Sequence, residues 1–124
     1  IRIELAPNTM KFIPGTFTIT SQEDKGKSFK IPGFHTPDGS VVTIGREDVN
    51  NERKFAHIRI ADKFATVSRK QAEILYAFDK LYVKNLSATN YTIVDGYELK
   101  PNERREISAG SVIKMGELEI TYQN

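Results

Sequence analysis

The stretch Thr66-Val67-Ser68-Arg69-Lys70-Gln71-Ala72-Glu73-Ile74 joins a short polar cluster to a run of alternating apolar positions. In an extended chain Ala72, Ile74, Tyr76 and Phe78 share one face, because side chains alternate between the two faces of a strand. Asp79-Lys80 would then turn the chain before the apolar residues 81–83. The stretch therefore predicts a polar loop followed by a strand.

A helix is the alternative interpretation of the same stretch. Ser68 and Gln71 have the spacing of a helix capping box. Ile74, Phe78 and Leu81 would share one face of the helix that follows. Periodicity alone does not separate the two interpretations. We expect the strand because the remaining chain is typical of strands, among which a lone central helix would fit poorly.

Two more polar loops follow apolar runs elsewhere in the chain. Residues 41–44 lead into Gly45-Arg46, where glycine permits an unusual backbone turn and arginine offers a planar fork of donors. Residues 87–90, Ser-Ala-Thr-Asn, form the third loop. Arginine, hydroxyl and amide side chains can hold a phosphate by hydrogen bonds as well as by charge. We therefore hypothesise a phosphate site where the three loops meet.

Short apolar segments separated by turn signals fill the rest of the sequence. Residues 1–20 are typical of two strands around a Pro7-Asn8 turn, and residues 21–40 are polar and rich in glycine and proline. Asp95-Gly96 is a strong hairpin signal. Strands at this spacing imply an all-β sandwich or barrel. We expect one domain over residues 1–124, with N-terminal strands and a polar loop in 1–40 and the main motifs in 41–122.

The composition limits the class of function. The 124 residues include no cysteine, which excludes disulfides, cysteine zinc sites and thiol catalysis and favours an intracellular protein, nuclear or cytoplasmic. The net charge of +2 is mild and evenly mixed, so direct nucleic-acid binding is not expected. No apolar run has the length of a membrane span. His35 and His57 lie far apart, without acidic or cysteine company, so we expect no metal and no cofactor.

Several motifs in this order resemble the forkhead-associated (FHA) domain, a phosphothreonine-recognition family. Residues 44–46, Ile-Gly-Arg, match the family's Gly-Arg, and residues 68–72, Ser-Arg-Lys-Gln-Ala, match its Ser-Arg-x-His-Ala. Residues 85–92, Asn-Leu-Ser-Ala-Thr-Asn-Tyr-Thr, match its Asp-Leu-Gly-Ser-Thr-Asn-Gly-Thr, and residues 110–116 match its Gly-Asp-x-Ile-x-x-Gly. The resemblance implies a two-sheet antiparallel β-sandwich of the SMAD/FHA-like type, with the binding loops at one end.

The resemblance also implies a binding site, position by position. Arg46 and Ser68 would grip the phosphate of a phosphothreonine, and Arg69 and Thr89 would assist at its edge. Asn90 would bond the backbone of the bound peptide. The partner would then be a protein that contains phosphothreonine.

Two departures from the family pattern bear on this site. Gln71 stands where the family has a histidine that braces the binding loop, and we expect the Gln amide to make an equivalent brace. Tyr91 replaces a family glycine and so places an aromatic ring beside the peptide groove.

Two other functions compete with phosphothreonine recognition. A forkhead-associated-like scaffold or dimerisation domain that has lost phosphate recognition would have the same fold, and Gln71 and Tyr91 would be the signs of that loss. An enzyme is not expected, because no histidine lies near a candidate nucleophile and no carboxylate pair stands out. We expect a monomeric domain within a larger protein.

Overall fold

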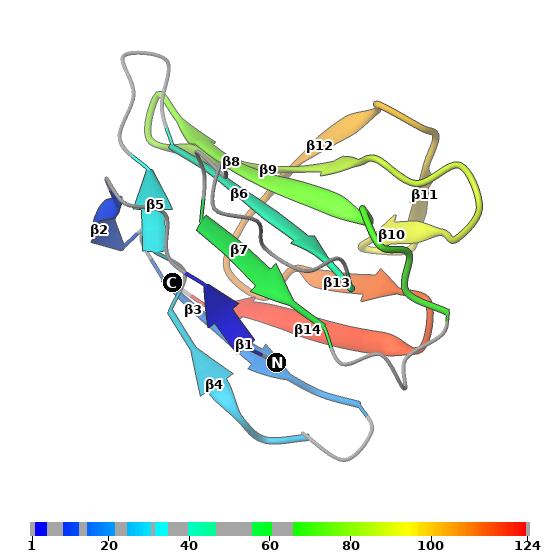
Figure 1. Cartoon of the computed structure of the whole chain (residues 1–124), viewed down its shortest axis with the longest axis horizontal. Helices are drawn as coiled ribbons and strands as arrows, with labels where there is room; N and C mark the ends of the chain where they lie inside the picture. The colour runs from blue at the N-terminus through cyan, green and yellow to red at the C-terminus, as the bar shows by residue number, and fades with distance from the viewer. Residues whose placement is uncertain are drawn as a thin grey trace.

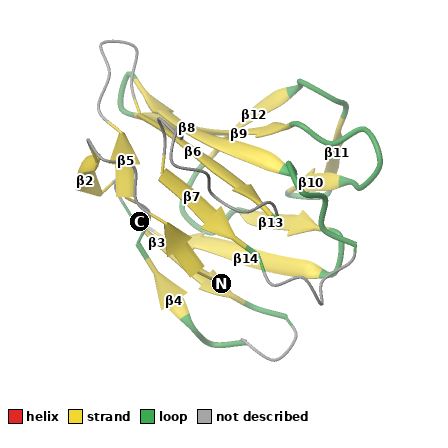
Figure 2. Cartoon of the chain, in the orientation of Figure 1, coloured by secondary structure: helices red, strands yellow, loops and turns green. Residues whose placement is uncertain are grey.

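The computed structural model describes residues 2–4, 9–12, 15–21, 25–30, 32–34, 40–46, 56–60 and 66–123. The described strands are β1 (Arg2–Glu4), β2 (Thr9–Phe12), β3 (Thr16–Ile19), β4 (Ser28–Phe29), β5 (Pro32–Phe34), β6 (Ser40–Gly45), β7 (Ala56–Arg59), β8 (Ala72–Ala77), β9 (Lys80–Asn85), β10 (Thr92–Val94), β11 (Tyr97–Leu99), β12 (Arg104–Ile107), β13 (Val112–Met115) and β14 (Leu118–Gln123). These residues contain no helix (Figure 2), so the helical interpretation of the stretch after Ser68 is wrong.

The described strands form two six-stranded sheets and one two-stranded sheet (Figure 1). The first large sheet has the order β1-β7-β6-β8-β9-β12, and the second has the order β11-β10-β13-β14-β3-β4. Strands β2 and β5 form the small sheet. Of the described pairs, β6 with β7 is parallel and the others are antiparallel. The predicted all-β, two-sheet sandwich is confirmed, with the parallel pair and the small sheet as additions.

The N-terminal region contains three strands where two were expected. Strand β1 pairs with β7, β2 pairs with β5, and β3 pairs with β14. Each strand therefore joins a different sheet. The alternation of apolar residues within a strand does not reveal which sheet the strand joins, because that choice depends on partner strands far along the chain. The expected Pro7-Asn8 turn and residues 35–39 of the polar loop lie outside the described residues.

The hydrophobic core lies between the two large sheets. In β8, Ala72 and Ile74 are buried while Glu73 between them is only half-buried. In β14 across the core, Leu118 and Ile120 are buried in the same alternating way. Burial of one such large apolar side chain contributes about 1.5–3 kcal/mol. This packing fixes one sheet against the other and so fixes the loops at their ends.

The turn between β8 and β9 falls one residue earlier than the sequence predicted. Phe78 and Asp79 have φ angles of 54° and 62°, and Lys80 already pairs with Ala77. Positive φ at both central residues is the geometry of a two-residue hairpin that follows the twist of its strands. Phe78 is therefore 90% exposed at the tip of the turn, so the prediction that it shares one strand face with Ala72 and Ile74 is wrong.

The strand directions bring the three predicted loops to one end of the sandwich. Ile44 near the end of β6 pairs with Ala72 at the start of β8, and Ala72 pairs with Asn85 at the end of β9. Residues 45–46, 66–71 and 86–91 therefore lie together, at the right in Figure 1. The β8–β9 turn lies at the opposite end, at the upper left of the same view.

Candidate functional site

The end of β6 and the loop before β8 are in close contact. The Arg46 backbone N–H donates to the Ser68 carbonyl oxygen at 3.2 Å. A Cβ added to Gly45 would lie 1.9 Å from the Arg69 carbonyl oxygen, far inside van der Waals contact. Only glycine fits there without moving the backbone. Position 45 therefore requires glycine because the second loop passes so close to its backbone.

The Arg46 side chain is half-buried and anchored to the same loop. Its Nε donates to the Val67 carbonyl oxygen. Arginine has five N–H donors in a planar fork, and the remaining ones have no partner in the described part of the chain. The anchored Nε thus holds the guanidinium at the Val67 carbonyl, and its other donors have no partner among the described residues.

Gln71 is fully buried and joins the second loop to the third. Its Oε1 accepts a hydrogen bond from the Ser68 backbone N–H at 2.8 Å. Its Nε2 donates to Thr92 Oγ1 at 2.8 Å and lies 3.2 Å and 3.3 Å from the carbonyl oxygens of Asn90 and Tyr91. The amide therefore has partners on both of its polar atoms, as a buried polar group requires.

Asn85, at the end of β9, is a second buried amide that organises the third loop. Its Oδ1 accepts from the Ser87 backbone N–H at 3.1 Å and from Thr92 Oγ1 at 2.9 Å. Its Nδ2 donates to the carbonyl oxygens of Ser87 at 3.0 Å and Leu99 at 3.1 Å. Thr92 thus links the two amides, because its hydroxyl accepts from Gln71 and donates to Asn85.

Ser87 and Asn90 close the network onto Ser68. Ser87 Oγ accepts from the backbone N–H groups of Thr89 at 3.2 Å and Asn90 at 3.0 Å, and it lies 2.5 Å from Ser68 Oγ. Asn90 Nδ2 donates to Ser68 Oγ at 2.8 Å. The bonds form a closed ring through Ser68, Gln71, Thr92, Asn85 and Ser87. We call this set the polar ring.

The sequence-predicted residues do not all occupy equivalent places. Ser68, Gln71 and Asn90 are bonded to one another directly. Thr89 has an exposed side chain, and only its backbone N–H is bonded to the polar ring. Arg69 is exposed, and the described part of the chain offers its side chain no hydrogen-bond partner. Residues 66–71 and 86–92 include Arg69 and Lys70 and no acidic residue, while Glu47 and Asp48, which follow Arg46 in the sequence, lie outside the described residues.

Sequence reasoning missed Asn85, Ser87 and Thr92 as members of the site. A signal for Asn85 was present: it lies two residues after Val83, on the buried face of the same strand. Strand alternation therefore puts an amide into the core, where it needs partners. The identity of those partners is not encoded locally, because Thr92 and Leu99 lie on other strands.

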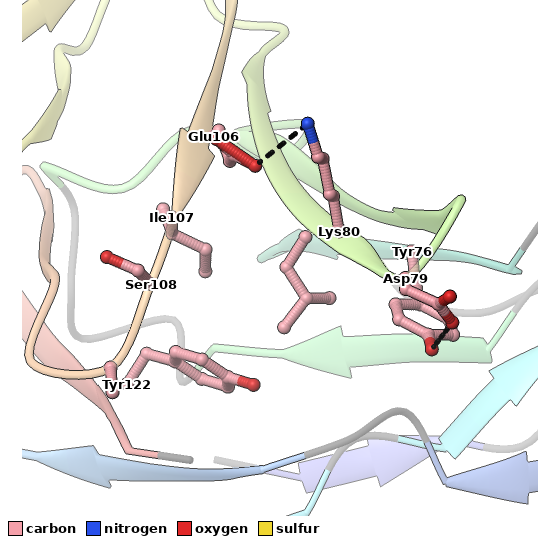
Figure 3. Close-up of a pocket in the computed structure, with 9 residues that line it drawn as sticks. Tyr76, Asp79, Lys80, Glu106, Ile107, Ser108 and Tyr122 are labelled. Carbon is pink, nitrogen blue, oxygen red and sulfur yellow. Dashed lines mark hydrogen bonds and ion pairs between the residues drawn. The ribbon is translucent and has the colours of Figure 1, made fainter.

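A hollow of about 260 Å³ lies at the opposite end, beside the β8–β9 turn. Figure 3 shows Tyr76 and Tyr122 as aromatic parts of its wall and the Lys80–Glu106 ion pair at its edge. No group of three potential metal ligands occurs in the described part of the chain. His35 lies outside that part, and of His57 only the backbone is described. Nor does any helix in the described ranges have the length and apolar character to cross a membrane.

Comparisons with known proteins agree with this fold. The model of the FHA domain family matches residues 42–116. An FHA domain of an Arabidopsis thaliana hypothetical protein has a TM-score of 0.65 at 20% identity, covering 90% of both chains. The FHA domain of the Chlamydia trachomatis CT664 protein has a TM-score of 0.64 at 18% identity, covering 88% of this chain and 95% of that one. No curated protein sequence shows a significant match.

A third similar structure includes a ligand. The N-terminal FHA domain of S. cerevisiae Rad53p, solved in complex with a phosphothreonine peptide, has a TM-score of 0.66 at 18% identity, covering 89% of this chain and 91% of that one. At this level of identity the three structures establish the fold.

Proposed function

Because the chain belongs to the FHA domain family, we propose that it is a protein-interaction module that recognises phosphothreonine in a partner protein. The observation that supports this most strongly is the polar ring, whose member Ser68 contacts Asn90 and follows Val67, the residue that anchors the Arg46 side chain. A site whose donors are already fixed binds with less loss of side-chain entropy. The complex of the yeast domain with a phosphothreonine peptide agrees with this ligand class.

The proposed roles follow from the chemistry of the side chains. Arg46 pairs with two phosphate oxygens through its fork of donors, and Ser68 donates to a third. The exposed side chains of Arg69 and Thr89 complete the shell at its edge. Asn90 keeps its Oδ1 and one N–H for the backbone of the peptide. Gln71 and the rest of the polar ring hold these groups in place.

The proposal includes the setting of the interaction. The partner is a phosphothreonine-containing protein, bound without membrane or nucleic acid, and the domain acts as a monomer within a larger intracellular protein, nuclear or cytoplasmic. It takes part in signalling and performs no catalytic step. The absence of cysteine from the sequence supports the intracellular location.

A scaffold or dimerisation domain without phosphate recognition is the competing function. Tyr91, which replaces the family glycine, is 63% exposed next to Asn90, and an exposed aromatic ring can serve a protein interface as well as a peptide groove. Substitutions of ligand-contacting side chains separate the two functions, because the scaffold needs neither Arg46 nor Asn90.

The test is a calorimetric titration with the best phosphothreonine peptide from a degenerate library, and with its unmodified and glutamate forms. We expect only the phosphorylated peptide to bind well, because a planar carboxylate has two oxygens where the phosphate has three. Binding should weaken below about pH 6, where the phosphate gains a proton. Arg46→Ala should weaken binding by tens of times or more, a loss of about 2–3 kcal/mol, with a smaller loss of stability of about 1 kcal/mol from its bond to the Val67 carbonyl.

Asn90→Ala should weaken binding of the peptide more than binding of free phosphate, because its partner is peptide backbone. Lys80→Ala is the control for loss of a positive charge, since Lys80 lies at the opposite end. Equal affinity for the phosphorylated and the unmodified peptide would contradict phosphothreonine recognition. So would unchanged binding in both Arg46→Ala and Asn90→Ala, and the scaffold would then be the better function.

A further inference from the structure

The hydrogen-bond capacity of Ser87 determines the direction of its bond to Ser68. A serine hydroxyl has one proton to donate and two lone pairs that accept. Ser87 Oγ accepts from two backbone N–H groups, those of Thr89 and Asn90, which can only donate. Its acceptor capacity is then used, so the 2.5 Å contact with Ser68 Oγ requires Ser87 to be the donor.

The same count of donors and acceptors shows that the Ser68 hydroxyl proton is not used within the described residues. Ser68 Oγ accepts from the Ser87 hydroxyl and from Asn90 Nδ2, which is also a pure donor. Both of its lone pairs are occupied. The Ser68 hydroxyl proton has no acceptor in the described part of the chain, and the side chain is half-buried beside Arg46 rather than free in solvent.

We propose that Ser87 is a positioning residue that turns the Ser68 hydroxyl into a fixed donor, aimed at a phosphate oxygen of the ligand. This inference rests on the proposed function. A free serine hydroxyl rotates between donor and acceptor orientations, and the ligand must stop that rotation on binding. Here Ser87 and Asn90 stop it beforehand, so Ser68 favours a ligand that only accepts, such as a fully deprotonated phosphate.

Ser87 also holds the third loop through two backbone N–H groups, and a test must separate that role from the positioning of Ser68. A double-mutant cycle does so. If Ser87 acts through the Ser68 hydroxyl, its removal matters only when that hydroxyl is present. If Ser87 acts through the loop alone, its removal lowers the peptide affinity by the same factor with or without the Ser68 hydroxyl.

The experiment measures the affinity of the best phosphothreonine peptide from a degenerate library for the parent chain, Ser68→Ala, Ser87→Ala and the double variant. We expect Ser87→Ala to weaken binding about tenfold in the parent, the value of one hydrogen bond to a charged group, and less than about twofold in the Ser68→Ala background. Equal losses in both backgrounds would overturn the positioning role and leave phosphothreonine recognition intact. A parent chain that binds no phosphothreonine peptide would overturn both.

Ser111→Ala is the matched control for loss of a buried serine. Ser111 and Ser87 are each 5% exposed. Ser111 Oγ accepts from the Ser108 backbone N–H and donates to Asp95, so it makes bonds of the same kind outside the three loops. We expect it to lower the melting temperature about as much as Ser87→Ala and to leave the affinity unchanged. If Ser87→Ala does not fold, Ser87→Gly replaces it in the cycle, because glycine is the residue of the family pattern at this position.

Discussion

The two ends of the sandwich use polar side chains in opposite ways. At the loop end, Gln71, Asn85, Ser87 and Thr92 are at most 5% exposed and bond to one another and to the backbone of two loops. The polar contacts of the β8–β9 turn itself are exposed and isolated. Lys80 and Glu106 lie 3.8 Å apart with side chains 58% and 51% exposed. Tyr76 donates to Asp79 at 3.1 Å, and this bond raises the pKa of the tyrosine.

This difference shows which end of the sandwich holds its polar side chains in a fixed geometry. Buried polar groups that lose a partner cost about 1–3 kcal/mol each, so a closed network such as the polar ring exists in one arrangement. Exposed pairs can separate at little cost because water replaces the partner. A binding site needs its donors fixed, and the polar ring at the loop end provides that. Substitutions that remove these supports should therefore have large effects at one end and small effects at the other.

The largest effect is expected from Gly45→Ala. The added methyl would meet the Arg69 carbonyl, a backbone atom that cannot move without shifting the whole loop. We expect a loss in the free energy of unfolding of about 3 kcal/mol or more, together with loss of phosphopeptide binding. Gly96→Ala is the control, since its Cβ meets nothing within 4 Å and its φ of +82° alone should cost about 1–2 kcal/mol. If the two variants lose the same free energy of unfolding in chemical denaturation, the close approach at Gly45 does not determine the effect.

Gln71→Ala comes next, because it opens the polar ring between two loops. The Ser68 N–H and the Thr92 hydroxyl would each lose a partner. We expect a loss in unfolding free energy of about 2–3 kcal/mol and a weakening of phosphopeptide binding of about tenfold. Gln71→His restores the family residue and should recover part of both losses. A variant that keeps its melting temperature but loses binding would mean that Gln71 contacts the ligand and does not brace the loop.

The smallest effect is expected at the opposite end. Lys80→Ala removes an exposed ion pair, and such pairs contribute about 0–1 kcal/mol. The free energy of unfolding and the phosphopeptide affinity should both stay within error of the parent in 0.15 M salt. A clear loss of affinity would place part of the binding surface at the β8–β9 end and would weaken the contrast between the two ends.

Local sequence patterns predicted the strands and the three polar loops, and the family resemblance supplied the two-sheet sandwich with its loops at one end. Alternation predicted β8, and polar residues after apolar runs predicted the loops around Arg46 and Ser68. The place of Phe78 was missed because a turn shifted by one residue reverses which side chains point inward. The roles of Ser87 and Thr92 were missed because a hydroxyl gains its function from partners that only the folded chain supplies.

The most direct test of the contrast between the two ends is a titration of the ¹⁵N-labelled domain with the selected phosphothreonine peptide, followed by NMR. We predict saturable shifts in the amides of Arg46, Ser68, Gln71, Thr89 and Asn90, with those of Phe78, Asp79 and Lys80 unchanged. The unmodified peptide should move neither set. Shifts confined to the β8–β9 end, or equal shifts with the unmodified peptide, would contradict phosphothreonine binding at the loop end.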